Sequence, residues 1–195
     1  TLQSLHLWGN QLIGPIPSEL GNLSKLTILD LGGNQLNGTI PPTLGDLTSL
    51  EVLYLCWNQL TGAIPTTIWN LTNLEILIID HNDLESNIPF EVNQLVELRE
   101  LQINSNRFSG EIPTEIGDLT NLYILNVGNN QFSGIIPDSL VSLNQLCTPD
   151  SELQGCWMDY GLDLGYNLFN TTGLSQTLLD FLAVKDPDWY LTQAV

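Results

Sequence analysis

The side chains best suited to metal binding in this chain are Cys56, Asp80 and His81. A thiol, a carboxylate and an imidazole can together bind zinc. The three residues lack the short spacings of a metal motif, and the other histidine, His6, lies far earlier in the sequence. We therefore expect no metal site, no cofactor and no enzymatic activity, and expect the chain to act by binding.

The dominant pattern is the phrase Leu-x-x-Leu-x-Leu-x-x-Asn-x-Leu-x-Gly-x-Ile-Pro, which returns every 24 residues. A fixed period of this length is typical of a stacked solenoid. One repeat cannot close its own core, so stability must come from stacking on its neighbours. The first leucine and the asparagine of the phrase recur at Leu2, Leu26, Leu50, Leu74, Leu98, Leu122 and Leu146, and at Asn10, Asn34, Asn58, Asn82, Asn106 and Asn130.

Each repeat predicts one short strand. In the first repeat Leu5 and Leu7 alternate with His6, which is the period of a strand with its leucines inward and His6 outward. Successive strands should pair in parallel as one sheet on the inner side. The asparagines are interpreted as structural, because an inward amide can satisfy the turning backbone. The glycines and Ile-Pro pairs suit bends and the outer side, where Trp69 replaces a glycine and is expected to point outward.

The repeats predict a solenoid of about seven coils over residues 1–170, with an insertion at 147–160. The strand pattern resumes near Leu162 after this insertion. The insertion carries Cys147 and Cys156, which suggests a short disulfide loop and an oxidising compartment, and two free thiols are the alternative.

The pattern becomes helical after the solenoid. Leucines and a phenylalanine recur at spacings of three and four, and Ser175 is a plausible first residue of the helix. We expect residues 171–195 to form a capping helix and a tail, with Trp189 against the last coil.

The charge is strongly acidic, with 22 Asp and Glu, four Lys and Arg, and a net charge of -18. Such a balance argues against nucleic acid and against an anionic membrane surface as partners. It could steer a basic protein partner, but solubility is the more ordinary reason for it. We find no apolar run long enough to span a bilayer and no signal peptide. An amino-terminal capping segment and any export signal are expected to lie outside this sequence.

Outward strand positions form columns along the sheet, and they are the candidate ligand-binding residues. Exposed aromatic side chains beside carboxylates suit a binding patch. The alternative is that these aromatic rings only pack across neighbouring strands. The candidates are His6, Trp8, Asp30, Tyr54, Trp57, Ile78, Asp80, His81, Gln102, Asn104 and Asn126.

Four Asn-x-Ser/Thr sequons are possible glycosylation sites, although the repeat itself favours Asn-Leu-Ser or Asn-Leu-Thr at the first and third of them. They begin at Asn22, Asn37, Asn70 and Asn170.

The repeated phrase, read here as Leu-Ile-Gly-Pro-Ile-Pro, Leu-Asn-Gly-Thr-Ile-Pro and Leu-Thr-Gly-Ala-Ile-Pro, resembles the plant-type leucine-rich repeat family. That variant is typical of receptor-kinase ectodomains and polygalacturonase-inhibiting proteins. The resemblance implies an α/β solenoid, a right-handed superhelix with a concave parallel β-sheet and an irregular or 3-10 convex side. The C-terminal helical cap expected from residues 171–195 departs from the short double-cysteine cap usual in plant receptors.

The resemblance also implies a secreted or cell-surface module that recognises a protein, peptide or glycan on the concave face, without catalysis. One alternative is a structural, matrix or ice-facing surface, suggested by threonine rows on the loop side. A second alternative is an inhibitor of a cell-wall-degrading enzyme. No direct membrane insertion is expected from this sequence.

Overall fold

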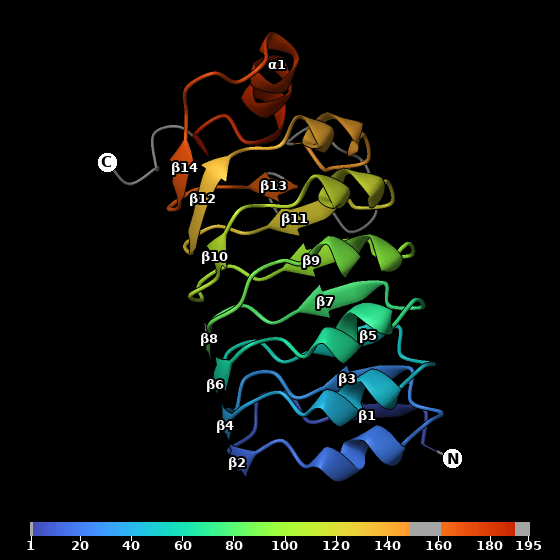
Figure 1. Ribbon diagram of the computed structural model, residues 1–195. Coiled ribbons are helices and arrows are strands. Elements are labelled where there is room, and N and C mark those ends of the chain that lie inside the picture. Colours follow the sequence, from blue (N-terminus) through green and yellow to red (C-terminus); the bar gives the residue numbers. More distant parts are fainter. Residues whose placement is uncertain (1, 149–160, 190–195) are drawn as a thin grey trace.

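Short parallel strands, one from each coil, pair side by side in a seven-stranded sheet (Figure 1). The computed structural model describes residues 2–148 and 161–189, and every structural statement concerns those residues. The inward leucines face each other in register, from Leu5 opposite Leu29 to Leu125 opposite Leu162, which confirms the predicted strand period. In order the strands are β1 (Ser4–His6), β3 (Ile28–Asp30), β5 (Val52–Tyr54), β7 (Ile76–Ile78), β9 (Glu100–Gln102), β11 (Ile124–Asn126) and β13 (Leu162–Asp163).

A second parallel ladder, which the sequence reading did not predict, runs beside the first. It comprises a four-stranded and a three-stranded sheet. Gly14 and Gly38 lie in it at φ of 86° and 76°, a conformation that favours glycine. Ser86 replaces this glycine in the fourth coil, and the ladder is interrupted there, between β8 and β10. The strands are β2 (Ile13–Pro15), β4 (Gln35–Gly38), β6 (Gln59–Gly62) and β8 (Asp83–Leu84), then β10 (Ser109–Gly110), β12 (Gln131–Ile135) and β14 (Leu168–Asn170).

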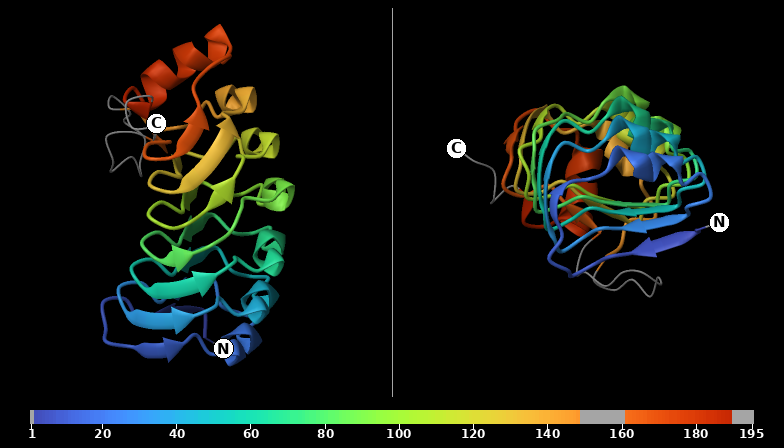
Figure 2. Two further views of the ribbon diagram at one scale, coloured as in Figure 1. Left: turned by 60° about the vertical axis from the view of Figure 1, so that its left-hand side comes forward. Right: turned by 90° about the horizontal axis from the view of Figure 1, so that it is seen from below.

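The third side of the coil is a stack of 3-10 turns, each preceded by the proline of an Ile-Pro or Pro-Pro pair (Figure 2). A Cβ built on Gly21 would lie 2.2 Å from the Thr43 carbonyl oxygen, so glycine lets these turns approach closely. The outward prediction for Trp69 is wrong, because this indole is 2% exposed and belongs to the leucine core, where burial of a large ring is most favourable. The turns are η1 (Ser18–Asn22), η2 (Pro42–Asp46), η3 (Thr66–Asn70), η4 (Phe90–Gln94), η5 (Thr114–Asp118) and η6 (Asp138–Ser142).

The asparagine column joins neighbouring coils, as predicted. Asn82 Nδ2 donates to the carbonyl oxygens of Leu55, Ile79 and Asp80 at 3.1, 3.1 and 3.2 Å, and its Oδ1 accepts from Leu60 N at 2.9 Å. One side chain therefore satisfies four backbone groups in two coils, which explains why the repeat needs an amide at this position.

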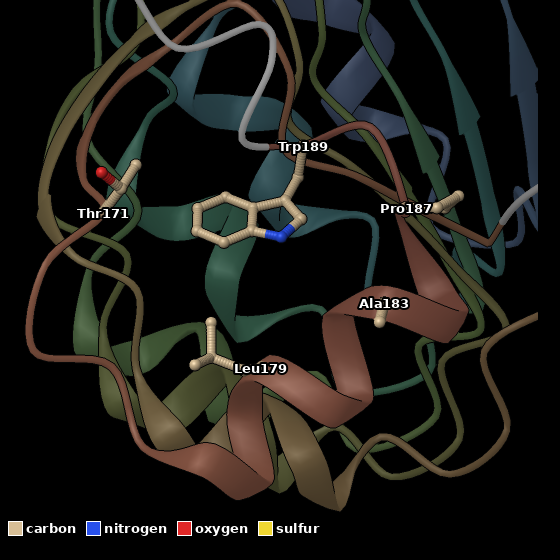
Figure 3. Close-up of a pocket in the computed structure, with 5 residues that line it drawn as sticks. All are labelled: Thr171, Leu179, Ala183, Pro187 and Trp189. Carbon is tan, nitrogen blue, oxygen red and sulfur yellow. The ribbon is translucent and has the colours of Figure 1, made fainter.

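Helix α1 (Gln176–Lys185) closes the far end of the stack (Figures 1 and 2). Ser175 is its N-cap and accepts a hydrogen bond from Leu178 N at 3.2 Å, as the sequence predicted. Leu178, Leu182 and Trp189 are buried against the core. A pocket at this cap is lined by Thr171, Leu179, Ala183, Pro187 and Trp189 (Figure 3). None of the described helices has the length and apolar character that a membrane crossing would need.

Asp186, directly after α1, terminates the seven-stranded sheet. Its Oδ2 accepts a hydrogen bond from Leu164 N at 2.7 Å, just beyond the end of strand β13. Beside it, the Lys185 ammonium donates to the Leu146 carbonyl oxygen. The two side chains thus fix the cap to the last coils.

Part of the predicted domain organisation falls outside the described residues. Cys156 in the insertion and the tail beyond Trp189 lie there, so the disulfide between Cys147 and Cys156 stays a prediction. Cys147 itself is buried. The division of the chain at residue 170 also stays a prediction.

Candidate binding surface

The outward column of the seven-stranded sheet brings six of the predicted residues into register. His6 lies opposite Asp30, Asp30 opposite Tyr54, and the column continues through Ile78, Gln102 and Asn126. Because neighbouring strands of a sheet lie about 4.8 Å apart, a ligand crossing several coils would meet these side chains in succession.

Two of the predicted residues are less accessible than expected. Asn126 and Asp80 are only 9% and 7% exposed, so they offer little surface to a partner. Both have short side chains that turn back to their own coil: Asn126 Oδ1 accepts from Gly128 N at 3.1 Å, and Asp80 Oδ2 lies 2.6 Å from His81 Nδ1. The alternation along the strand predicted which face of the sheet these side chains lie on, but it did not predict that they are buried there.

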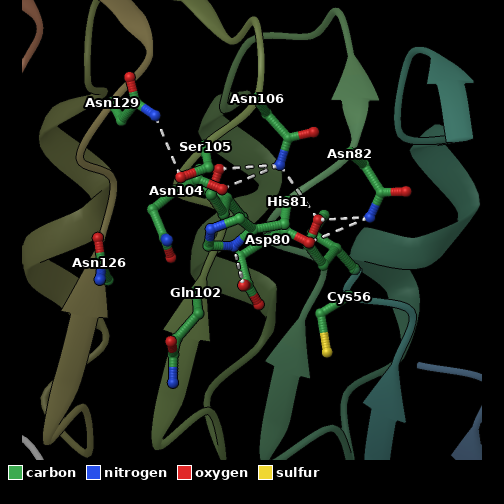
Figure 4. Close-up of polar contacts among 12 residues, drawn as sticks. Cys56, Asp80, His81, Asn82, Gln102, Asn104, Ser105, Asn106, Asn126 and Asn129 are labelled. Carbon is green, nitrogen blue, oxygen red and sulfur yellow. Dashed lines mark hydrogen bonds and ion pairs between the residues drawn. The ribbon is translucent and has the colours of Figure 1, made fainter. Parts of the chain in front are cut away.

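A stacked pair of aromatic rings follows strands β5 and β7. The Trp57 and His81 ring centroids are 3.8 Å apart and the ring planes differ by 10°. Trp57 is 56% exposed, whereas the His81 ring is held by its contact with Asp80 (Figure 4). Such a stack presents a flat, fixed surface at low conformational cost to a ligand.

These rings stand on left-handed backbone. The residue before each repeat asparagine has a positive φ, which glycine supplies in the first two coils. The later coils have other residues at this position, although residues with a side chain rarely adopt a positive φ, and each such residue costs about 1–2 kcal/mol. The residues and φ angles are Gly9 (69°), Gly33 (61°), Trp57 (54°), His81 (51°), Ser105 (54°), Asn129 (52°) and Tyr166 (54°). We call this set the left-handed column.

Trp8 lies against the glycines of the second coil. A Cβ built on Gly32 would lie 2.2 Å from Trp8 Cζ3, and one on Gly33 would lie 3.4 Å from Trp8 Cε2. The indole therefore rests on bare backbone, and it is 53% exposed. Gly33 separates it from Trp57, the next member of the left-handed column.

Carboxylates lie along the whole sheet face. Asp30 ends strand β3 and Asp80 follows strand β7, Glu100 in β9 accepts a hydrogen bond from Gln102, and Asp163 in β13 accepts from Gly165 N at 2.8 Å. Burial raises the pKa of Glu100, with a further increase from the charge of Asp80 that opposes the lowering by Gln102. Burial likewise raises the pKa of Asp163. The sheet face thus disfavours additional negative charge.

Tyr54 is a neutral donor in the same column. Burial raises its pKa above 10, and the charges of Glu100 and Asp30 raise it further. Its phenol therefore stays protonated and can donate to a ligand acceptor.

Cys56 is not an activated nucleophile. Burial, followed by the charge of Asp80, raises the pKa of its thiol to about 12, and the side chain is 5% exposed. The thiolate that attacks a substrate or binds a metal is therefore scarce. Within residues 2–148 and 161–189, no group of three or more His, Cys, Asp and Glu is arranged to hold a metal ion.

The four sequon asparagines all lie on exposed positions, which is compatible with glycosylation and leaves it a prediction. Asn170 Oδ1 accepts hydrogen bonds from Thr172 N and Oγ1 at 3.0 and 2.8 Å. The remaining three are Asn22, Asn37 and Asn70.

Comparison with known families agrees with the coiled architecture. A family described as leucine-rich repeat region matches residues 1–110, more than half of the chain, and a leucine-rich repeat matches residues 121–143. The chain belongs to the leucine-rich repeat family. The resemblance drawn from the repeated phrase is therefore confirmed. No curated protein matches the chain in sequence at a significant level.

Solved structures of other leucine-rich repeat proteins share the fold. The ectodomain of the receptor kinase GASSHO1/SCHENGEN3 from Arabidopsis thaliana, solved with CASPARIAN STRIP INTEGRITY FACTOR 2, is 41% identical over 86% of this chain, with a TM-score of 0.77. PEPR1, solved with AtPEP1, is 38% identical over 87% of this chain, with a TM-score of 0.76. The chain spans 18% and 25% of those two structures.

A plant ice-binding protein also has this fold. It is 24% identical over 86% of this chain and 58% of its own, with a TM-score of 0.66. At that identity the similarity concerns the fold alone.

Proposed function

We propose that the chain is a non-catalytic recognition module that binds a peptide or a peptide segment of a protein across the outward face of its seven-stranded sheet. The observation that carries this proposal is the row of aromatic and polar side chains on that face, including Trp8, Tyr54, Trp57 and Gln102, which the leucine core does not need. An extended peptide rises about 3.3 Å per residue and neighbouring strands lie about 4.8 Å apart, so about three residues of the ligand would span two coils.

Rigidity is the proposed mechanism of recognition. The strands and the asparagine amides hold the outward side chains before the ligand arrives, which lowers the ordering cost of binding. The similar structures GASSHO1/SCHENGEN3 and PEPR1 were solved with CASPARIAN STRIP INTEGRITY FACTOR 2 and AtPEP1, which supports a protein or peptide ligand over a small molecule.

A selection from a displayed random-peptide library, followed by calorimetric titration of the selected peptides, tests the proposal. We expect Tyr54→Ala and Gln102→Ala to weaken binding at least tenfold, which is about 1.4 kcal/mol and typical of an interface contact. Their melting temperatures should stay close to that of the parent protein, because both side chains lie outside the core.

Phe90→Ala is the matched control, because Phe90 is an aromatic residue on the 3-10 side and is 63% exposed. The proposal would be overturned by selected peptides that bind the Tyr54→Ala and Gln102→Ala variants as tightly as they bind the parent protein but bind the Phe90→Ala variant more weakly. That result would place the binding surface on the 3-10 side.

Secretion or exposure at the cell surface belongs to the same proposal and is supported by the receptor ectodomains that share the fold. The ice-facing alternative would need threonine hydroxyls that are available to water. Thr43 and Thr67 Oγ1 instead donate at 2.7 Å to the carbonyl oxygens of Ser18 and Pro42, which weakens that alternative. Inhibition of a cell-wall-degrading enzyme stays an alternative that a direct inhibition assay would reveal.

A further inference from the structure

Four aliphatic side chains gather on the outward face of the seven-stranded sheet. Ile28 is in register with Val52, and Val52 with Ile76. In the neighbouring outward column, Ile78 lies opposite Tyr54. The four aliphatic side chains are half-buried, and among the described residues the leucine core includes none of them. We call Ile28, Val52, Ile76 and Ile78 the aliphatic strip, and its exposed part is available to an apolar group of a ligand.

A carboxylate continues the line of the strip, because Ile76 is in register with Glu100. Glu100 is half-buried and accepts a hydrogen bond from the neutral amide of Gln102. Within residues 2–148 and 161–189, no lysine or arginine pairs with it, and its neighbour Arg99 pairs with Glu75 at 3.3 Å. A carboxylate that is partly removed from water and lacks a cation would be stabilised by a cation from a ligand.

The surroundings of Glu100 differ from those of the other acids on this face. Asp30 Oδ1 accepts from Gly32 N at 3.2 Å, and Asp80 contacts the His81 ring.

Near Glu100, by contrast, lie two phenols. Burial raises the pKa of both Tyr54 and Tyr123, and the negative charge of Glu100 is the next cause in each case. Both phenols therefore stay neutral, and neither of them balances the charge of the carboxylate.

The spacing of the strip and the carboxylate favours one ligand conformation. Val52 and Glu100 lie two coils apart in the same column, which is about 9.6 Å at the usual strand separation. A polyproline II helix has three residues per turn and rises about 3.1 Å per residue, so residues i and i+3 face the same side about 9.3 Å apart. In a fully extended chain the same two residues would point to opposite sides.

We propose that this face binds a peptide segment in the polyproline II conformation, with an aliphatic side chain on Val52 and Ile76 and a lysine or arginine side chain, three positions away, on Glu100. This inference rests on the proposed function and names the chemistry of its ligand. The methylene stem of the basic residue can lie on Ile78 while its charged group reaches the carboxylate. The net charge of -18 favours a basic ligand over an acidic one.

The test is a nuclear magnetic resonance titration with the blocked peptide Pro-Leu-Pro-Pro-Lys-Pro. The matched probe carries N-acetyl-lysine in place of lysine, which keeps the stem and removes the charge. We follow the methyl signals of Val52 and the side-chain amide signals of Gln102, which donates to Glu100. We expect saturable shifts of both with the lysine peptide. The acetyl-lysine peptide should bind about 3–10-fold more weakly, as expected for an ion pair partly removed from water.

Glu100→Gln removes the charge and keeps the size of the side chain. We expect this variant to bind the two peptides equally. Glu51→Gln is the matched control, because Glu51 is an exposed glutamate directly before strand β5 and its loss changes the net charge by the same amount. Since an exposed charge is screened by salt, we expect Glu51→Gln to retain the preference for lysine within about twofold. Both variants should keep the melting temperature of the parent within a few degrees.

The peptide Pro-Leu-Lys-Pro-Pro-Pro tests the spacing, because its leucine and lysine are adjacent and cannot face the same side of a polyproline II helix. We expect it to bind as weakly as the acetyl-lysine peptide.

Three results would refute the inference: equal affinity for the lysine and acetyl-lysine peptides, a preference for lysine that survives Glu100→Gln, or the absence of a saturable shift at Val52. The proposed function can be judged separately. Library-selected peptides that lose affinity for Tyr54→Ala but bind Glu100→Gln as tightly as the parent would leave peptide recognition standing and exclude the basic site at Glu100.

Discussion

Asp186 is the described carboxylate whose titration should change the stability of the C-terminal cap most. It is 8% exposed, and its Oδ2 accepts from Leu164 N at 2.7 Å. Burial raises its pKa from 3.8 to about 6, against the lowering effect of that hydrogen bond, and the charges of Asp163 and Asp188 add to the increase. Between these two pH values, the Asp186 carboxyl is protonated in the folded cap and ionised in the unfolded chain.

The pKa of Asp186 is higher in the folded cap than in the unfolded chain by about two, which corresponds to roughly 3 kcal/mol in the free energy of unfolding. The contribution of Asp186 to stability is fully present below pH 3.8 and is lost as the pH rises to about 6. Above that value it no longer changes. The cap should therefore be more stable in mild acid than at neutral pH, although acid destabilises many proteins.

Urea unfolding and hydrogen exchange of the α1 amides, measured between about pH 4 and pH 7, test this expectation. In Asp186→Asn the amide oxygen can still accept from Leu164 N, so we expect nearly constant cap stability over this range. At neutral pH the variant should exceed the parent by up to about 3 kcal/mol. Asp46→Asn, on an exposed turn, is the control for the loss of one negative charge. If Asp186→Asn and the parent lose stability in parallel, the reasoning is refuted.

Three further substitutions test other parts of the structure by urea unfolding. Trp57→Asn should change the free energy of unfolding by less than about 1 kcal/mol, because relief of left-handed strain offsets the lost stacking; a large loss would show that the ring is structural. Asn82→Ala should destabilise by about 3 kcal/mol or more, because buried carbonyls and an amide lose their partner, whereas Asn10→Ala at the exposed first coil should cost far less. Trp69→Ala should cost about 3–5 kcal/mol as a core cavity; a neutral effect would contradict its burial.

The repeated phrase predicted the seven-stranded sheet because leucine burial and the asparagine amides are local consequences of residue type. Asn82 meets two carbonyl oxygens of its own coil and two backbone groups of the preceding coil, and because every coil follows the same phrase, the repeat suffices to interpret it. The N-cap role of Ser175 was predictable for the same reason.

The features that the sequence did not predict depend on neighbouring coils. The glycines at Gly14 and Gly38 did not reveal that they lie in a second ladder, opposite Leu36 and Leu60, because a glycine in a tight turn and one in a strand look alike in sequence. Trp69 appeared exposed because other repeats have glycine in its place, yet the interior had room for an indole. The ring stack of Trp57 and His81 required knowledge of which residues take a positive φ, and Gly9 and Gly33 were the signal that could have shown it.

In the left-handed column, the positive φ of the backbone limits which amino acids the outer surface can present. A substitution at Ile78 changes the side chain that a partner would touch, whereas one at Ser105 or Asn129 must also tolerate a backbone conformation that most amino acids avoid. We therefore expect few amino-acid types at the positions of the left-handed column. Glycine and asparagine fit the backbone there with little strain, and bulky residues should occur only where they contribute to binding.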